Sequence, residues 1–515
     1  MESTKPRKRH CWECRRRYLV CDSTEPTCKR CFTSGIECPG YSDVKPTHYK
    51  WLAPGRVTSR GRRRDKPRSD ATDKTNTKIT IKPIKEARCA TVETLLVIPR
   101  LEMRTEACAL AQAAEYYNSC IYRDLVPVSE LGPTPCIYPL SAAVLRVVPE
   151  APDYLLYGML CMTLSHRINQ TRNDPQIRTL FERFYQYWGF ALHSLSRHLD
   201  IEDGRKGDMA IAGILTLMLT DIQQGTSLNW RYHLEGIHKL IALRGGFHVV
   251  ASRKSLAPLL LCHWFISVIG NTTCPASDLS TTGSELDALD LLLKRYGDAV
   301  ATFQMCPLPL VVEIVNINHL RARANITGSY GTAAGTKDHW HHEAYEILER
   351  VSTFPPEQWA DSKLSSREDW LAIGNAYKAA VALYCVLSLQ SSSILPITPD
   401  LRAACTIHGQ LLQVFLEKGL SSPKTKRSMI WPLVLLGVEA VHGDAATRAF
   451  VARQLPELSR DVGTCVPLTA KRVLERFWAS GETSWDDCFD RPYAFMSQIA
   501  VDTSRLYSVH PADVQ

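Results

Sequence analysis

The sequence has little that would suit a membrane or a secreted protein. Its most apolar stretch, Leu256 to Gly270, is broken by His263 and is shorter than the ~20 residues that a membrane helix needs. The segment from Met1 to His10 contains no apolar run typical of a secretory signal. We therefore expect a soluble intracellular protein that has no membrane partner and whose cysteines stay reduced.

The motifs of common enzymes are also absent. The sequence contains no G-x-S-x-G nucleophile motif, and the glycines of residues 328–337 lack the order of a phosphate-binding loop. Residues 339–346 hold three histidines and two glutamates, but not in the H-E-x-x-H order of a catalytic zinc site. We expect this cluster to be a solvated helix start, and we predict that the protein is not an enzyme.

Alternating patterns that indicate β-strands are scarce, whereas helical patterns recur. The best strand candidate, Thr77 to Ile84, is short. Apolar residues at helical spacing predict helices in the ranges 181–199, 207–219, 230–241, 284–296, 341–351, 370–390, 401–418, 428–442 and 467–480. Gly245 and Gly246 are expected to end the third of these helices. The predicted fold class is mainly α, with a large all-helical domain over residues 105–515.

Positive charge is confined to one end of the 515-residue chain. Residues 1–90 carry 23 Lys and Arg against 10 Asp and Glu, a net charge of +13, whereas the remaining residues carry −5. A basic arm on a near-neutral body indicates a polyanionic partner, with nucleic acid first. We interpret residues 41–104 as a flexible basic linker, because their first part is polar and basic with few apolar residues. Its candidates for nuclear import or phosphate contact are Arg60, Arg62, Arg63, Arg64, Lys66 and Arg68.

Six of the 18 cysteines lie within 28 residues at a repeated spacing, in which C-x2-C-x6-C occurs twice. These cysteines are Cys11, Cys14, Cys21, Cys28, Cys31 and Cys38. Zinc prefers four thiolates in a tetrahedron, and six cysteines supply the eight ligand positions of two Zn²⁺ ions if two of them bridge. The symmetry of the repeat indicates Cys11 and Cys28 as the bridging pair. A disulfide knot and a single zinc held by the two C-x2-C pairs are the alternatives, and the second would leave Cys21 and Cys38 unexplained.

The segment CWECRRRYLVCDSTEPTCKRCFTSGIEC, with Asp22 after its third cysteine and Pro26 before its fourth, resembles the fungal Zn2Cys6 binuclear-cluster family. The resemblance implies that residues 1–40 form a two-zinc module that presents a short helix to the major groove of double-stranded DNA, often as a dimer. The segment GDMAIAGILTLMLTDIQQGTSLNWRYHLEGIHKLIALRGGF resembles the helical regulatory domain of the same regulators. Because no heptad repeat follows the cysteines, formation of a homodimer stays open.

The two halves of the cysteine repeat differ in charge, since three arginines follow Cys14 whereas uncharged residues follow Cys31. We therefore expect the first half to face DNA, with Arg17 reading a base edge and the other cations contacting phosphates. Tyr18 and Val20 stand where the family usually has Lys or Arg, so the half-site is open, and Tyr18 could equally pack on the cluster. The residues expected at the DNA are Arg15, Arg16, Arg17, Tyr18, Lys29 and Arg30.

Together these features predict a nuclear, sequence-specific DNA-binding regulator of RNA polymerase II transcription, which also contacts the transcription machinery or co-regulators. A zinc-stabilised protein-interaction scaffold is the first alternative, and an enzyme with a helical ligand-binding body is the second. Residues 485–490 mix acidic and aromatic side chains, as activation segments do, although a loop between helices explains them equally well.

Overall fold

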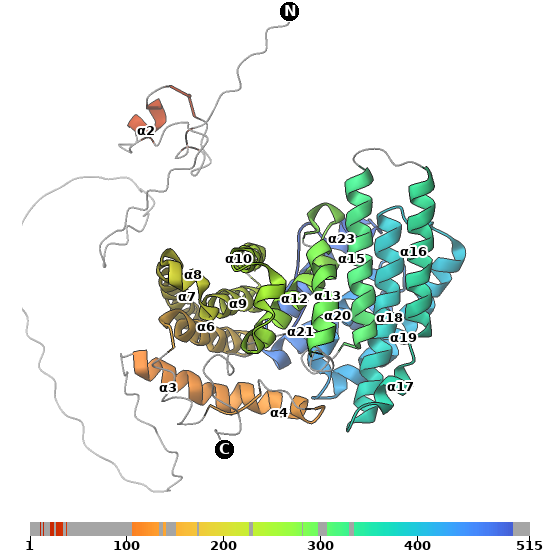
Figure 1. Cartoon of the computed structure of the whole chain (residues 1–515), viewed down its shortest axis with the longest axis horizontal. Coiled ribbons are helices and arrows are strands. Elements are labelled where there is room, and N and C mark those ends of the chain that lie inside the picture. Colours follow the sequence, from red (N-terminus) through yellow and green to blue (C-terminus); the bar gives the residue numbers. More distant parts are fainter. Residues whose placement is uncertain are drawn as a thin grey trace, which may run out of the picture. The chain divides into compact units, whose positions relative to one another are not determined.

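The computed structural model of the chain divides into two compact units, Met1–Val97 and Ile98–Gln515 (Figure 1). It describes residues 11, 14, 21–24, 27–33, 38, 106–132, 137–140, 151–172, 175–225, 230–280, 282–296, 306–328 and 334–497. These residues form helices and no β-strand, which confirms the mainly α fold class. The predicted strand over residues 77–84 lies outside the described residues.

The first part of the second unit is a group of helices around α6, which packs on α3, α7 and α9. Helix α9 in turn packs on α10 and α12. The helices are α3 (Glu106–Tyr116), the π-helix η1 (Tyr117–Tyr122), α4 (Arg123–Ser129), α6 (Asp153–Gln170), α7 (Ile177–Asp200), α8 (Glu202–Lys206), α9 (Asp208–Gln224), α10 (Trp230–Leu243), α11 (Phe247–Val250), the 3₁₀ turns η3 (Lys254–Leu256) and η4 (Ala276–Asp278), α12 (Ala257–Thr272) and α13 (Thr282–Tyr296).

The second part surrounds α18, against which α15, α16, α17, α19 and α20 pack. In Figure 1, α15, α16, α18 and α19 lie beside one another at the end of the domain away from α6 and α7. From α15 onward the helices are α15 (Leu308–Gly328), α16 (Ala334–Thr353), α17 (Pro356–Asp361), α18 (Arg367–Ser391), α19 (Pro399–Ser421), the 3₁₀ turn η5 (Lys426–Met429), α20 (Ile430–Glu439), α21 (Ala445–Val462), α22 (Val466–Ser480) and α23 (Trp485–Cys488).

Helix α18 is strongly apolar and lies in the interior of the domain. Of the described helices it is the one long and apolar enough to cross a membrane by length and composition, but 83% of its most apolar window is buried. Helix α12 is likewise buried along its whole length. Helices that are hydrophobic all round belong either in the interior of a large protein or in a membrane, and burial places these two in the interior.

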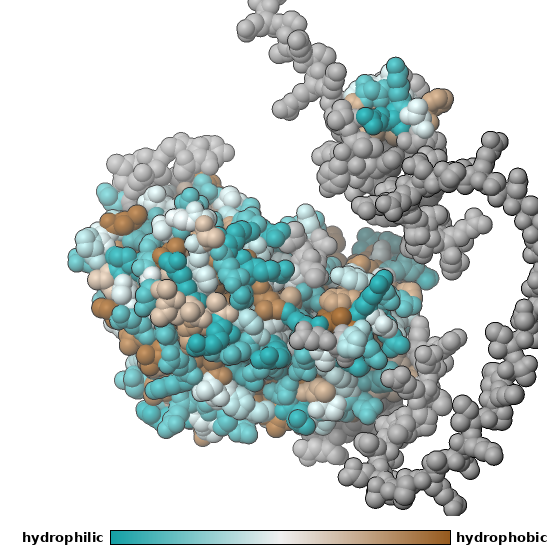
Figure 2. Space-filling view, turned by 180° about the vertical axis from the view of Figure 1, so that it is seen from behind, coloured by the Kyte–Doolittle hydropathy of each residue, from teal (hydrophilic) through white to brown (hydrophobic). Residues whose placement is uncertain are grey.

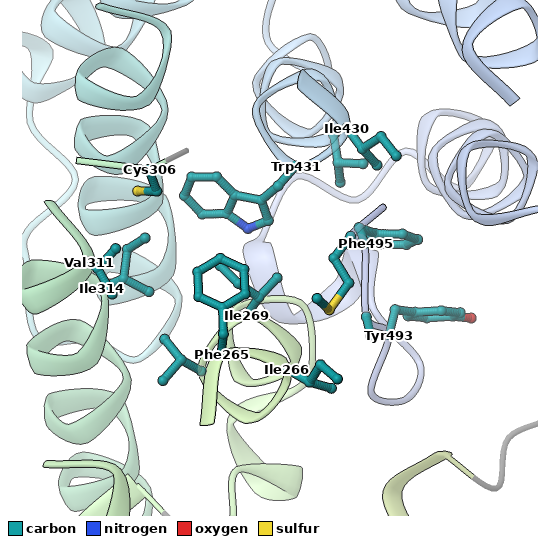
Figure 3. Close-up of a cluster of buried hydrophobic side chains, with 14 of the residues drawn as sticks. Phe265, Ile266, Ile269, Cys306, Val311, Ile314, Ile430, Trp431, Tyr493 and Phe495 are labelled. Carbon is teal, nitrogen blue, oxygen red and sulfur yellow. The ribbon is translucent and has the colours of Figure 1, made fainter. Parts of the chain in front are cut away.

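One continuous hydrophobic core joins the two parts of the helical domain. Trp431 of α20 lies where side chains of α12, α15 and the segment after α23 meet, close to Phe265 and Ile269 (Figure 3). Its ring stacks on Tyr377, with 5.8 Å between centroids, and its indole N–H donates to Thr272 Oγ1 at 2.9 Å. The face of the helical domain seen in Figure 2 is mostly hydrophilic, with scattered hydrophobic side chains.

The glycine pair after α10 ends that helix as predicted. Gly245 and Gly246 have φ values of 93° and 91°, a left-handed region that other residues rarely adopt. The N–H of Gly246 donates to the carbonyl of Ile241 at 3.0 Å, and the N–H of Gly245 donates to that of Ala242 at 3.1 Å. These bonds satisfy carbonyl groups that the last turn of a helix leaves unpaired.

The apolar residues that predict a helix over residues 181–199 include Tyr185 and Leu192, and they form a wider stripe than the face that α7 buries. Phe184 and Leu195 are buried, whereas Tyr185 and Leu192 are exposed at 53% and 40%. The neighbouring helices α6 and α9 cover one side of α7 and leave the flank that carries Tyr185 and Leu192 in solvent. Spacing alone therefore gave the helix correctly but overestimated its buried face.

The aromatic residues at 485–490 lie in the core, whereas Asp486 is half-buried and Asp487 and Asp490 are exposed. Trp485 and Phe489 are fully buried, and Asp486 receives the side chain of Arg321, a guanidinium with no exposed surface. Arg321 donates to Asp486 Oδ1 at 2.9 Å, to Tyr384 Oη at 3.1 Å, and to the carbonyls of Asn271 and Cys274. The segment therefore forms a short helix that joins α12, α15 and α18, and its aromatic residues serve packing.

We expect Arg321→Ala to lower the free energy of unfolding of the helical domain by about 3–5 kcal/mol, because it leaves Asp486 and two buried carbonyls without their partner. Thermal unfolding followed by circular dichroism measures the change. The matched control is Arg367→Ala, which breaks an ion pair with Asp361 whose two side chains are more than half exposed. It should leave the melting temperature nearly unchanged. Equal effects of the two variants would contradict a structural role for the buried pair.

Candidate metal centre and nucleic-acid interface

The six clustered cysteines come together in the first unit. Two groups of four thiols each lie close enough to hold one metal ion: Cys11, Cys14, Cys21 and Cys28 form one, and Cys11, Cys28, Cys31 and Cys38 form the other. Within each group all sulfur atoms lie within 4.8 Å of one another. The groups share Cys11 and Cys28, the pair that the sequence repeat indicates as bridging.

The sulfur–sulfur distances fit tetrahedral zinc. Cys11 Sγ lies 3.7 Å from both Cys28 Sγ and Cys31 Sγ, and Cys14 Sγ lies 3.7 Å from Cys28 Sγ. Zinc–thiolate bonds of about 2.3 Å in a tetrahedron separate the sulfur atoms by about 3.8 Å. A disulfide would need about 2.05 Å, and all the described cysteines are free thiols. The donor set therefore fits two zinc ions and not a disulfide knot.

Backbone N–H groups repeat the symmetry of the cysteine pattern. The N–H of Cys14 donates to Cys11 Sγ at 3.4 Å, and the N–H of Cys31 donates to Cys28 Sγ at 3.3 Å. Each shared sulfur thus accepts a hydrogen bond from the second cysteine of its own C-x2-C pair. Such bonds orient the sulfur and favour its thiolate form, which is the form that binds metal.

Cys11, Cys14 and Cys31 would hold their protons without a metal. Burial, followed by hydrogen bonding with Cys28, raises the pKa of Cys31 to about 12, and burial also raises the pKa values of Cys11 and Cys14. Zinc must therefore displace protons on binding, so that its affinity falls as the pH falls. Zinc bound at these sulfurs would supply structural cross-links between the two halves of the repeat.

Asp22 connects the two halves of the repeat. Its carboxylate accepts the N–H of Lys29 at 3.2 Å, at the start of helix α2 (Lys29–Thr33), and also accepts the hydroxyl of Thr24. These bonds lower the pKa of Asp22, the hydroxyl of Thr24 contributing most. Sequence reasoning noted Asp22 only as part of a resemblance. Because Asp22 lies seven residues before Lys29 and not at the N-cap position, no local sequence signal indicated this contact.

The candidate DNA contacts are described only in part. Lys29 and Arg30 are exposed on α2, next to Phe32, whose side chain is 77% exposed. Arg15, Arg16, Arg17, Tyr18 and Val20 lie outside the described residues, as does the whole basic cluster from Arg60 to Arg68. The described cations are thus free to meet a phosphate, and the choice of the first half as the DNA face remains a prediction.

The polar cluster over residues 339–346 lies on α16. His339, His341 and His342 are exposed, His342 pairs with Glu346 at 3.2 Å, and His341 lies against the ring of Tyr345. Among the described residues, the groups that could hold a metal consist of cysteines alone. The cluster is a solvated helix face, as expected.

Both units of the chain contain a segment that matches a known protein family. Residues 9–47 match the fungal Zn(2)-Cys(6) binuclear cluster domain, and residues 113–497 match the fungal specific transcription factor domain. A protein of Leptosphaeria maculans named "Phomenoic acid biosynthesis cluster-specific transcriptional regulator" is 48% identical over 506 residues, which cover 97% of this chain and 91% of that protein. No solved structure matches the chain.

The two domain matches cover most of the chain, and the L. maculans regulator aligns with nearly all of it. Both the cysteine geometry and the helical architecture agree with these matches. The chain therefore belongs to the family of fungal DNA-binding transcription regulators that combine a two-zinc, six-cysteine cluster with a fungal specific transcription factor domain.

Proposed function

We propose that this protein is a nuclear, sequence-specific regulator of RNA polymerase II transcription, and that its targets are the genes of a biosynthetic gene cluster. The observation that carries the proposal is the pair of four-thiol groups that share Cys11 and Cys28. The similarity to a cluster-specific regulator, which extends through the helical domain, supports the choice of targets. Membership of a family of regulators argues against the alternative of an enzyme.

In this proposal the six cysteines are the zinc ligands. Cys14 and Cys21 complete one tetrahedron and Cys31 and Cys38 complete the other, while Cys11 and Cys28 bridge. A segment of this size buries too little apolar surface to fold alone. Zinc binding energy would therefore be folding energy, and loss of one ligand would unfold the module.

DNA recognition would begin with phosphates and end at base edges. The basic first unit would capture the duplex by charge, with Arg15, Arg16, Lys29 and Arg30 on phosphates. Arg17 would then read a guanine, the base that offers arginine two acceptors in the major groove. Tyr18 would lie beside it, in a position to alter the half-site that the family usually reads.

We expect genome-wide mapping of bound sites to recover one short motif that is enriched at a biosynthetic gene cluster. The recovered motif would also report the half-site, the spacing and any dimer symmetry. Cys14→Ala should remove all these sites, together with the footprint in vitro, because the module unfolds. Cys120→Ala, which removes a thiol of the helical domain, is the control and should bind as the unaltered protein does. A Cys14→Ala protein that still footprints would contradict DNA binding through the zinc module. A zinc-loaded protein without DNA affinity would support the scaffold alternative.

We expect Arg17→Ala to cost about 1–3 kcal/mol of specific binding and to relax base preference at one position. Lys29→Ala is the matched comparison, since a lost phosphate contact should weaken binding to all sequences about equally and lower the salt slope by about 1. Titrations of the full chain on matched and mutated sites at several salt concentrations separate the two outcomes. Uniform weakening by Arg17→Ala would make Arg17 a phosphate contact instead.

The basic cluster of the linker would direct the protein to the nucleus. Replacing Arg62, Arg63 and Arg64 by Gln should shift a fluorescently tagged full chain to the cytoplasm, because import receptors read clustered positive charge. Binding of the purified variant to the mapped site is measured alongside. Nuclear accumulation equal to that of the unaltered protein would exclude an import role, and weakened DNA binding would show phosphate contact by the same residues.

A further inference from the structure

The outward face of α19 is apolar although it lies in solvent. The inner face of this helix packs on α18 and α20, and its residues Leu412 and Leu416 have no exposed surface. The opposite face carries Ile407, Leu411 and Val414, whose side chains are exposed at 56%, 45% and 49%. Residues four and three positions apart are neighbours on a helix, so these side chains form one stripe. Figure 1 shows α19 among the helices at the end of the domain away from α6 and α7.

This outward face also lacks charge for about four turns. Residues 403–416 contain no Asp, Glu, Lys or Arg, although charged residues make up 22% of the chain. Its other exposed side chains are uncharged, such as Thr406 and Gln410, whereas the exposed face of α21 carries charges such as Arg453 and Glu457. A solvated helix face is normally charged or polar, so an uncharged face with three large aliphatic side chains indicates an interaction surface.

One acidic and one basic side chain lie at the two ends of the stripe. Asp400 is in the first turn of α19 and Lys418 is in its last turn, and both are exposed. Their separation of 18 positions equals five turns of an α-helix, which places both on the same side of the helix as Leu411. No ion pair among the described residues involves either side chain. Both charges are therefore available to a partner.

A second copy of α19 is complementary to this face when the two helices run antiparallel. A two-fold axis beside Leu411 places Ile407 opposite Val414 of the second copy, and Asp400 of each copy near Lys418 of the other. A parallel pair would instead place Asp400 against Asp400 and Lys418 against Lys418, and like charges oppose association. The order of acid, apolar stripe and base along one helix thus favours a second copy of this chain as the occupant.

We propose that two copies of this chain associate through the outward faces of α19, as an antiparallel pair. Burial of the apolar stripe drives the association, and the two pairs of Asp400 with Lys418 fix its direction. The sequence after the cysteines contains no heptad repeat that would pair the chains there. The pair needs neither zinc nor DNA to form, and it would bring two zinc modules to one DNA molecule.

Sedimentation velocity of the full zinc-loaded chain without DNA, from about 1 to 100 μM, tests the proposal. We expect the mass to rise with concentration from that of one chain toward that of two. Leu411→Glu should raise the dissociation constant at least about tenfold, about 1.4 kcal/mol, because it sets two carboxylates beside the axis. Leu364→Glu is the matched control, since this leucine is fully exposed in the turn before α18, and it should associate as the unaltered chain does.

An exchange of charges tests the direction of the pair. Asp400→Lys alone should weaken association, because the new cation meets Lys418 of the second copy. The double variant Asp400→Lys, Lys418→Asp should recover it, because opposite charges then face each other again. A parallel pair would show neither the loss nor the recovery. The melting temperature of each variant, followed by circular dichroism, separates association from folding.

A chain that stays monomeric at about 100 μM would overturn the proposal and leave the outward face of α19 to a partner of another kind. Equal dissociation constants for Leu411→Glu and Leu364→Glu would overturn it as well, because the copies would then meet elsewhere. If Leu411→Glu unfolds, the exchange between Asp400 and Lys418 decides, since both side chains are exposed. Failure of the double variant to recover association would contradict the antiparallel pair.

Discussion

The separation of about 3.7 Å between sulfur atoms is the constraint on which the first unit depends. The buried cluster of this unit, in the part that the structure describes, consists of Cys11, Cys14, Cys21, Cys28 and Cys31, with Cys38 packed against it. Among these described residues, no aliphatic or aromatic side chain belongs to the cluster. Metal–sulfur bonds would therefore cross-link the module where the described residues provide no apolar core. The side chains that the module would present to DNA depend for their position on these sulfur atoms.

The second unit, in contrast, is built around a large hydrophobic core. Its core is continuous from α6 to the segment after α23, and it encloses polar groups such as Arg321, which donates to Asp486 and Tyr384. A buried guanidinium is costly unless its donors are used, and here four groups accept from it. The protein therefore joins a cysteine cluster suited to zinc to a helical domain built around a hydrophobic core.

Sequence reasoning succeeded where a signal is local. The cysteine spacing led to the two groups that share Cys11 and Cys28, and Gly245 with Gly246 marked the end of α10. It failed where tertiary packing decides. The stripe of α7 could not reveal that Tyr185 and Leu192 face solvent, because exposure depends on where α6 and α9 lie. The mixed composition of residues 485–490 could not reveal that Trp485 and Phe489 are buried, or that Asp486 binds Arg321, because Arg321 lies 165 residues away in the sequence.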